Sequence, residues 1–162
     1  MTDLHDESRR VALADEAATT RLAARLAALA RPGDVLALSG GLGAGKTVFA
    51  RGFLRARAGD PALEVPSPTF TLVQVYDLPG GAVWHLDLYR LSDPSEVWEL
   101  GVEEAFADAI LLVEWPERMG AFLPETSLAI ELAPGAGAGA RVAILDAPEC
   151  WKERLAALPV DG

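Results

Sequence analysis

Four glycines, a lysine and a threonine fall within eight consecutive residues of this sequence. Residues 40–47 read Gly-Gly-Leu-Gly-Ala-Gly-Lys-Thr and satisfy the pattern G-x-x-x-x-G-K-[ST]. Glycines let the backbone bend until successive N–H groups turn inward around an anion. A helix that begins at this point adds the positive end of its dipole. A chance match is expected in roughly one of a thousand sequences of this composition, so the stretch predicts a phosphate site.

Each position of the pattern has its own chemical task. Lys46 supplies a mobile positive charge to the terminal phosphates of a nucleotide, and Thr47 supplies a hydroxyl to Mg²⁺. The backbone of the preceding residues supplies the N–H donors. The residues expected to bind the nucleotide here are Gly41, Leu42, Gly43, Ala44, Gly45, Lys46 and Thr47.

Two acidic residues stand at or next to predicted strands. Asp87 lies within His-Leu-Asp-Leu-Tyr-Arg (85–90), and Glu114 follows Ile-Leu-Leu-Val (110–113). Strand ends converge on the ligand crevice of an α/β sheet, so both carboxylates are candidates for the metal site or for catalysis. The alternatives are a strand-edge charge paired with Arg90 for Asp87, and a solvated loop residue for Glu114.

The segment Ser-Pro-Thr-Phe-Thr (67–71) offers two threonines and a rigid proline. Such a segment can sense a terminal phosphate as switch segments do, or it can simply lead into a strand. The chain contains no asparagine. Because guanine-specific proteins of this kind read the base through an Asn-Lys-x-Asp element, ATP is the expected nucleotide.

The elements that must position these residues follow from hydrophobic periodicity and from glycine and proline. A short apolar strand precedes the glycine loop and a helix follows it, in the order that a phosphate-binding loop needs. A Pro-Gly-Gly turn at 79–81 predicts a hairpin, and the alternation of helices and strands predicts an α/β fold. The expected strands are Val35–Leu38, Thr69–Tyr76, Ala82–Tyr89, Ala109–Val113, Leu128–Leu132 and Arg141–Leu145. The expected helices are Asp15–Ala30, Lys46–Ala58, one opening at Asp93, and Glu149–Leu158.

Length and composition limit the class of protein. The 162 residues, of which 51% are hydrophobic, suit one domain spanning 1–162, with residues 1–10 expected to be flexible. We see no signal peptide and no bilayer-spanning run, and the single cysteine excludes an intrachain disulfide, so we expect a cytoplasmic protein. The net charge of −10, with 14 basic and 24 acidic residues, argues against independent binding to nucleic acid and suits a basic protein partner.

Taken in order, these motifs resemble one family. The set comprises the glycine loop, Arg-Gly-Phe-Leu (51–54), Ser-Pro-Thr-Phe-Thr-Leu-Val (67–73), His-Leu-Asp-Leu-Tyr-Arg-Leu (85–91) and Glu-Trp-Pro (114–116). It is similar to the TsaE (YjeE) family of bacterial ATPases over nearly the whole chain. The resemblance implies a single P-loop NTPase-like domain with a central, mostly parallel sheet, an antiparallel hairpin and flanking helices.

The resemblance also implies a function. Members take part in forming threonylcarbamoyladenosine on tRNA; they bind the TsaD and TsaB proteins, and their ATPase activity is thought to drive or reset the cycle of that pair. Contact with tRNA would be indirect, and no membrane is involved. ATP and Mg²⁺ are the implied cofactors.

The resemblance implies roles for individual residues of this chain, those at matching positions of the family motifs. Lys46 and Thr47 would serve the phosphates and Mg²⁺, Glu114 would bind the metal, and Asp87 would be a second acid at the metal or the attacking water. Further nucleotide contacts are implied for Thr19, Thr69, Thr71 and Trp115.

One departure concerns the rate of hydrolysis. The family loop commonly begins Gly-Asp-Leu-Gly, whereas Gly41 stands in place of the aspartate here. In addition, the Gly/Ala run 134–140 offers few side chains where relatives use a basic residue near the nucleotide. Two alternatives therefore stay open beside an ATPase: a small-molecule kinase, and a non-hydrolysing module gated by ATP.

Overall fold

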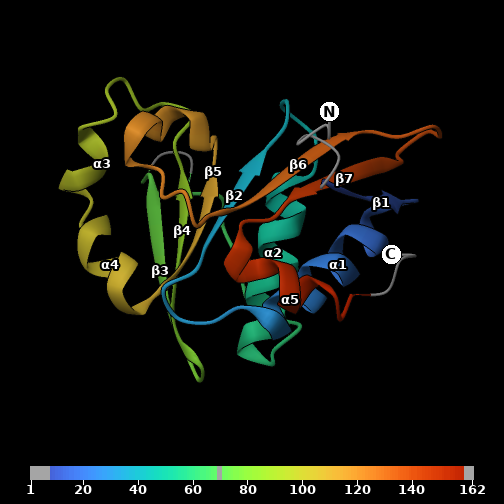
Figure 1. The fold of residues 1–162 in the computed structure, drawn as a ribbon, viewed down its shortest axis with the longest axis horizontal. Helices are drawn as coiled ribbons and strands as arrows, with labels where there is room; N and C mark the ends of the chain where they lie inside the picture. Colours follow the sequence, from blue (N-terminus) through green and yellow to red (C-terminus); the bar gives the residue numbers. More distant parts are fainter. Residues whose placement is uncertain (1–7, 69–70, 159–162) are drawn as a thin grey trace.

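Seven strands form one mixed sheet in the order β1-β7-β6-β2-β5-β4-β3 (Figure 1). The computed structural model describes residues 8–68 and 71–158. The strands are β1 (Arg9–Leu13), β2 (Val35–Ser39), β3 (Val73–Leu78), β4 (Gly81–Asp87), β5 (Ile110–Glu114), β6 (Leu128–Pro134) and β7 (Arg141–Asp146). The helices are α1 (Glu16–Leu29), α2 (Lys46–Ala58), α3 (Glu96–Glu99), α4 (Val102–Asp108), the 3₁₀ segment η1 (Pro116–Phe122) and α5 (Glu149–Leu155).

The centre of the sheet is parallel and its edges are antiparallel. β2 pairs in parallel with both β5 and β6, and β5 pairs in parallel with β4. The antiparallel pairs are β3 with β4, β6 with β7, and β7 with β1. Central parallel strands are covered on both faces, which explains the uninterrupted apolar runs of β2 and β5. The carboxyl ends of β2, β4 and β5 consequently meet at one edge.

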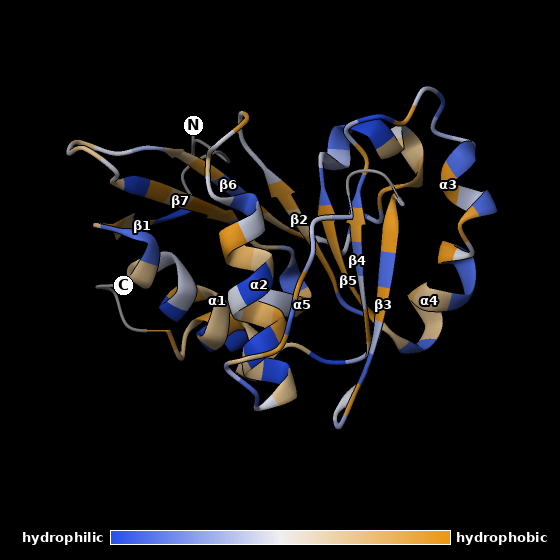
Figure 2. Ribbon diagram, turned by 180° about the vertical axis from the view of Figure 1, so that it is seen from behind, coloured by the Kyte–Doolittle hydropathy of each residue, from blue (hydrophilic) through white to orange (hydrophobic). Residues whose placement is uncertain are grey.

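Successive side chains of the central strands enter two separate cores. Leu36 of β2 and Leu112 of β5 pack with α1, α2 and α5. Leu111 and Val113 of β5 pack on the other face, with α3, α4 and η1. Figure 2 shows hydrophobic residues along the central strands, whereas α1 and α2 carry mixed colours because only one side of each helix is buried.

Helices α1 and α2 pack closely through Gly52. A Cβ atom at this position would lie 3.1 Å from the Cα and Cγ2 atoms of Thr20 and 3.3 Å from Cβ of Ala23. A larger residue would therefore push the two helices apart. Their close packing sets the first turn of α1 beside the first turn of α2, where the glycine loop ends.

The predicted α/β class is confirmed, and most predicted elements lie within a few residues of the observed ones. The hairpin between β3 and β4 turns at the predicted Pro-Gly pair. Half of the strand pairings are antiparallel, however. Besides the predicted β3–β4 hairpin, the pairs β6–β7 and β7–β1 are antiparallel. No helix in the described ranges is long and apolar enough to cross a bilayer.

Two expectations about boundaries need correction. Residues 1–7 of the segment expected to be flexible lie outside the described residues, but Arg9 and Arg10 belong to β1 and pair with β7. Strand β3 begins at Val73 rather than at residue 69. Thr69 and Phe70 lie outside the described residues.

Candidate functional site

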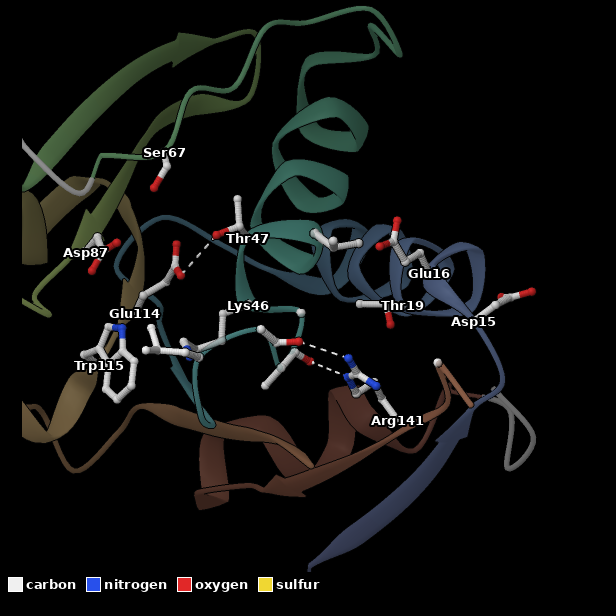
Figure 3. Close-up of a pocket in the computed structure, with 16 residues that line it drawn as sticks. Asp15, Glu16, Thr19, Lys46, Thr47, Ser67, Asp87, Glu114, Trp115 and Arg141 are labelled. Atoms are coloured by element: carbon white, nitrogen blue, oxygen red, sulfur yellow. Dashed lines mark hydrogen bonds between the residues drawn. The ribbon is translucent and has the colours of Figure 1, made fainter. Parts of the chain in front are cut away.

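A cavity of about 440 Å³ opens in front of the glycine loop, at the edge where β2, β4 and β5 end (Figure 3). Its walls come from six separate parts of the chain. They are Asp15, Glu16 and Thr19 of α1; Leu42, Gly43, Ala44 and Gly45 of the loop; Lys46, Thr47 and Val48 of α2; Ser67; Asp87, Glu114 and Trp115 at the strand ends; and Gly139 and Arg141 of the β6–β7 hairpin.

The shape of the glycine loop depends on particular glycines. Gly43 and Gly45 have φ angles of 76° and 104°, a region that favours glycine. A Cβ atom at Gly40 would lie 2.5 Å from the carbonyl oxygen of Leu132 in β6. Gly41 differs, because a Cβ atom there would meet nothing within 4 Å. Helix α2 begins directly after the loop, so its free N–H groups face the cavity.

Lys46 lies beneath the loop and is 5% exposed. Its Nζ donates hydrogen bonds to the carbonyl oxygens of Gly40 (2.6 Å) and Gly41 (2.8 Å), and it lies 4.2 Å from the centre of the Trp115 ring. Burial lowers the pKa of Lys46, and the nearby carboxylates of Glu114 and Asp87 oppose that shift only in part. The cation thus sits at the base of the cavity.

Glu114 lies opposite the start of α2 and is almost fully buried, at 2% exposure. Its Oε1 accepts a long hydrogen bond of 3.5 Å from the Thr47 hydroxyl, and its Oε2 lies 2.6 Å from Nε2 of His85. Asp87 is the register partner of Glu114 on β4, so the two carboxylates point to the same face. Oδ1 of Asp87 accepts a hydrogen bond of 3.1 Å from the backbone N–H of Tyr89.

The donor set around Thr47 suits Mg²⁺. A hydroxyl and two carboxylates are hard oxygen donors, and Mg²⁺ typically takes one or two protein carboxylates and completes its shell with phosphate oxygens and water. The described part of the chain holds no group of three or more His, Cys, Asp and Glu side chains arranged around a metal. A cation in this cavity would therefore need a phosphate ligand to complete its coordination.

Trp115 adopts an unusual backbone conformation at the end of β5. Its φ of 60° lies in the left-handed region, which a non-glycine residue occupies at some cost. The ring packs on Tyr89, with centroids 5.0 Å apart, and covers Lys46. This conformation turns the chain sharply after Glu114 and places the indole beside the cavity.

The opposite wall of the cavity contains Thr19 and Arg141. Thr19 is 3% exposed and lies in the first turns of α1, which Asp15 caps by accepting a hydrogen bond of 2.9 Å from the Ala18 N–H. Arg141 begins β7 and donates to the carbonyl oxygens of Ala44 (3.1 Å) and Gly43 (3.0 Å). Figure 3 shows Arg141 pointing at the loop from this side.

Most of the predicted site residues meet at this cavity. Thr19, the loop from Leu42 to Gly45, Lys46, Thr47, Asp87, Glu114 and Trp115 all line it. The exposed Gly41 does not line it and contributes a carbonyl to Lys46 instead. Thr71 is also exposed and away from the lining, where it accepts a 3.4 Å hydrogen bond from Gln74. Thr69 lies outside the described residues.

Six residues of the lining were not predicted from the sequence: Asp15, Glu16, Val48, Ser67, Gly139 and Arg141. Ser67 belongs to the segment 67–71, in which the predicted contacts were the two threonines. The sequence predicted only that Arg141 begins a strand, yet it is a basic residue that lines the cavity directly after the run 134–140. The hairpin register, in which Arg141 pairs with Pro134, brings it back to the loop. The only sequence signal for it was its position directly after the Gly/Ala run.

The strand, glycine loop and helix at the centre of the sheet, with two carboxylates at the neighbouring strand ends, define an α/β protein of the P-loop-like class. The family model described as "Threonylcarbamoyl adenosine biosynthesis protein TsaE" matches residues 13–142. The chain therefore belongs to the TsaE family.

Relatives from distant bacteria support this membership. The chain is 38% identical over 120 residues to "tRNA threonylcarbamoyladenosine biosynthesis protein TsaE" of Rickettsia bellii, covering 74% of this chain and 83% of that protein. It is 42% identical over 113 residues to the protein of the same name from Bacillus subtilis, covering 69% of each. For the Rickettsia felis protein the alignment is 43% identical and spans 65% of this chain and 61% of the relative.

A solved structure shares the fold. The structure titled "Crystal structure of Bacillus subtilus YdiB" superposes with a TM-score of 0.74 at 29% sequence identity. The superposition covers 93% of this chain and 92% of the other. The described sheet and helices are therefore those of a known protein fold.

Proposed function

We propose that this protein binds ATP with Mg²⁺ and hydrolyses it as an accessory subunit in the threonylcarbamoyladenosine modification of tRNA. Its partners would be the TsaD and TsaB proteins. The observation that carries the proposal is the convergence, in one cavity, of the buried Lys46 cation, the Thr47 hydroxyl and the carboxylates of Glu114 and Asp87. The names of the relatives support the assignment to this pathway.

The roles of the residues follow from their chemistry. Backbone N–H groups of the loop and of the first turn of α2 would bind the phosphates, and Lys46 would neutralise charge on the terminal phosphate. Thr47 and Glu114 would hold Mg²⁺, which when bound polarises the phosphate oxygens. Asp87, on the same face of the sheet as Glu114, would orient the attacking water and accept its proton.

The adenosine would extend along α1. Thr19 and Glu16 line the cavity on the side away from the carboxylates, so the nucleoside would lie there while the phosphates enter the loop. The net charge of −10 makes direct capture of tRNA unfavourable. Contact with tRNA would therefore run through the partner proteins.

The deciding experiment measures ATP hydrolysis by the purified protein alone and with the TsaD–TsaB pair. We expect slow turnover alone, faster turnover with the pair, and none with Lys46→Ala. A phosphate transferred to an acceptor instead of to water would point to a kinase. ATP binding without turnover in either condition would sink the ATPase proposal and leave a nucleotide-gated subunit.

A further inference from the structure

We infer that His85 is a positioning residue for the metal site: it holds the Glu114 carboxylate so that the free oxygen faces Thr47, and it thereby sets the Mg²⁺ affinity. This inference rests on the proposed function, because it concerns the metal that accompanies the nucleotide. His85 is not among the described residues that line the cavity, and it is fully buried.

The geometry of the sheet places the two side chains together. His85 of β4 is the register partner of Leu112 of β5, and Glu114 lies two residues further along β5. Side chains two residues apart on a strand share a face. The imidazole of His85 therefore lies on the same face of the sheet as Glu114, one diagonal step away on the neighbouring strand. Nε2 of His85 and Oε2 of Glu114 are 2.6 Å apart, with side-chain exposures of 0% and 3%. This is a short and fully enclosed contact.

The second ring nitrogen indicates which atom carries the proton. Nδ1 of His85 is buried and has no hydrogen-bond partner among the described residues. A proton on Nδ1 would leave a buried donor unpaired, which is costly, whereas an unpaired acceptor lone pair costs less. The favoured form therefore has the proton on Nε2, where it is donated to Glu114.

Glu114 has few other constraints on its orientation. Among the described residues, its carboxylate has two hydrogen-bond partners, His85 at 2.6 Å and Thr47 at 3.5 Å. The Lys46 cation, although near, donates to the loop carbonyls rather than to Glu114. The short contact with His85 is therefore the one that holds Oε2 and directs Oε1 toward Thr47.

Such an arrangement has a defined consequence for metal binding. A partner that orients a ligating carboxylate typically contributes 10–100-fold to metal affinity, by order of magnitude. Without His85, one buried carboxylate oxygen of Glu114 would lose its donor, and the side chain would be free to turn away from Thr47. Binding of the nucleotide without metal depends on the loop and Lys46, and is expected to change little.

The first test reads the tautomer in the unaltered site. The chain contains two histidines, His5 and His85, so in a His5→Ala protein the imidazole ¹⁵N resonances belong to His85 alone. We expect ¹⁵N–¹H correlation spectra to show a proton on Nε2, the nitrogen that faces Glu114. A proton on Nδ1 with a bare Nε2 would overturn the inference without any change at the site.

The second test uses a matched pair of substitutions. In His85→Gln the amide nitrogen occupies the place of Nε2 and still donates to Glu114, whereas in His85→Asn it occupies the place of Nδ1 and cannot reach. For each protein, the affinity for ADP is measured with Mg²⁺ and with a chelator. The ratio of these two affinities is the gain from the metal, that is, the factor by which Mg²⁺ strengthens ADP binding. Electron paramagnetic resonance of Mn²⁺ with ADP provides a second readout that is independent of turnover.

We expect His85→Asn to reduce the gain from the metal by about tenfold or more, with metal-free ADP affinity within about threefold of wild type and His85→Gln close to wild type. A merely structural role would lower both affinities together. A wild-type protein without any gain from Mg²⁺ would overturn the proposed metal site itself. A wild-type gain that His85→Asn keeps in full would overturn the role of His85 alone.

Discussion

Arg141 and Ala44 are 97 residues apart in the chain, yet Nε of Arg141 donates a hydrogen bond of 3.1 Å to the carbonyl oxygen of Ala44. A second nitrogen of the same guanidinium donates to Gly43 at 3.0 Å. Among the described residues Arg141 forms no ion pair, so its charge is directed at the loop and the cavity. The β6–β7 hairpin thus holds the glycine loop in shape.

Substitution of Arg141 tests this tether. Arg141→Ala removes two charge-assisted hydrogen bonds to the loop, each of which contributes roughly 1.5 kcal/mol or more, so we expect ADP affinity to fall by at least about tenfold by calorimetry. Arg141→Lys should recover little of the lost ADP affinity, because a lysine ammonium cannot donate two hydrogen bonds in the planar geometry of a guanidinium. Arg21→Ala, on the exposed face of α1, is the control and should bind as wild type does. Unchanged binding by Arg141→Ala would exclude the tether.

Two adjacent glycines should respond differently to the same substitution. Gly40 has a φ of 138°, and a Cβ atom there would lie 2.5 Å from the backbone of β6. Gly40→Ala should therefore lower the free energy of unfolding by about 2 kcal/mol or more. Gly41→Ala should change it by less than about 0.5 kcal/mol, because nothing lies within 4 Å. Urea denaturation of both variants measures the difference, and equal losses would contradict the assigned loop geometry.

Gly41 also stands where the family resemblance leads us to expect an aspartate. Gly41→Asp introduces a carboxylate into open space, so the protein should fold and bind ADP normally. If that acid assists hydrolysis, turnover with the TsaD–TsaB pair should rise several-fold. Gly41→Asn, of the same size without the charge, is the control. Equal rates for both variants and wild type would show that this position does not limit turnover.

The buried Lys46 predicts a change of stability with pH. Burial lowers the pKa of Lys46 in the folded protein below its ordinary value of 10.5, so between the lowered pKa and 10.5 the unfolded chain binds a proton that the folded chain has released. The contribution of Lys46 to the free energy of unfolding therefore rises with pH in this window. Below the lowered pKa the cost of the buried charge is fully present.

Comparison with Lys46→Met isolates this effect. We expect the wild-type protein to gain stability relative to Lys46→Met as the pH rises toward 10.5, measured by urea unfolding without nucleotide. A difference that stays flat up to pH 10.5, or that falls, would contradict the lowered pKa.

The charge of Asp87 can be removed with little change of shape. In Asp87→Asn the amide oxygen can still accept from the Tyr89 N–H, so folding and ADP affinity should be retained. Loss of the proposed general base should reduce partner-stimulated turnover about a hundredfold. Asp77→Asn, an exposed carboxylate on neighbouring β3, is the matched control. Full activity in Asp87→Asn would remove this residue from the mechanism.

The sequence by itself determined the local parts of this protein. The glycine pattern predicted the phosphate loop and the two elements beside it, because backbone bending depends on glycine and helix entry depends on nearby residues. The apolar runs of β2 and β5 likewise predicted strands. Asp87 and Glu114 were candidates because each lies in or next to a predicted strand.

Only the tertiary structure decided which distant residues meet. Nothing local in Arg-Arg-Val-Ala-Leu (9–13) identifies β1, which exists as a strand because β7 offers it an edge. The contact of His85 with Glu114 and the reach of Arg141 to the loop depend on the order and register of the strands. Order and register result from how whole elements pack against one another, so the spacing of residues along the chain does not encode them.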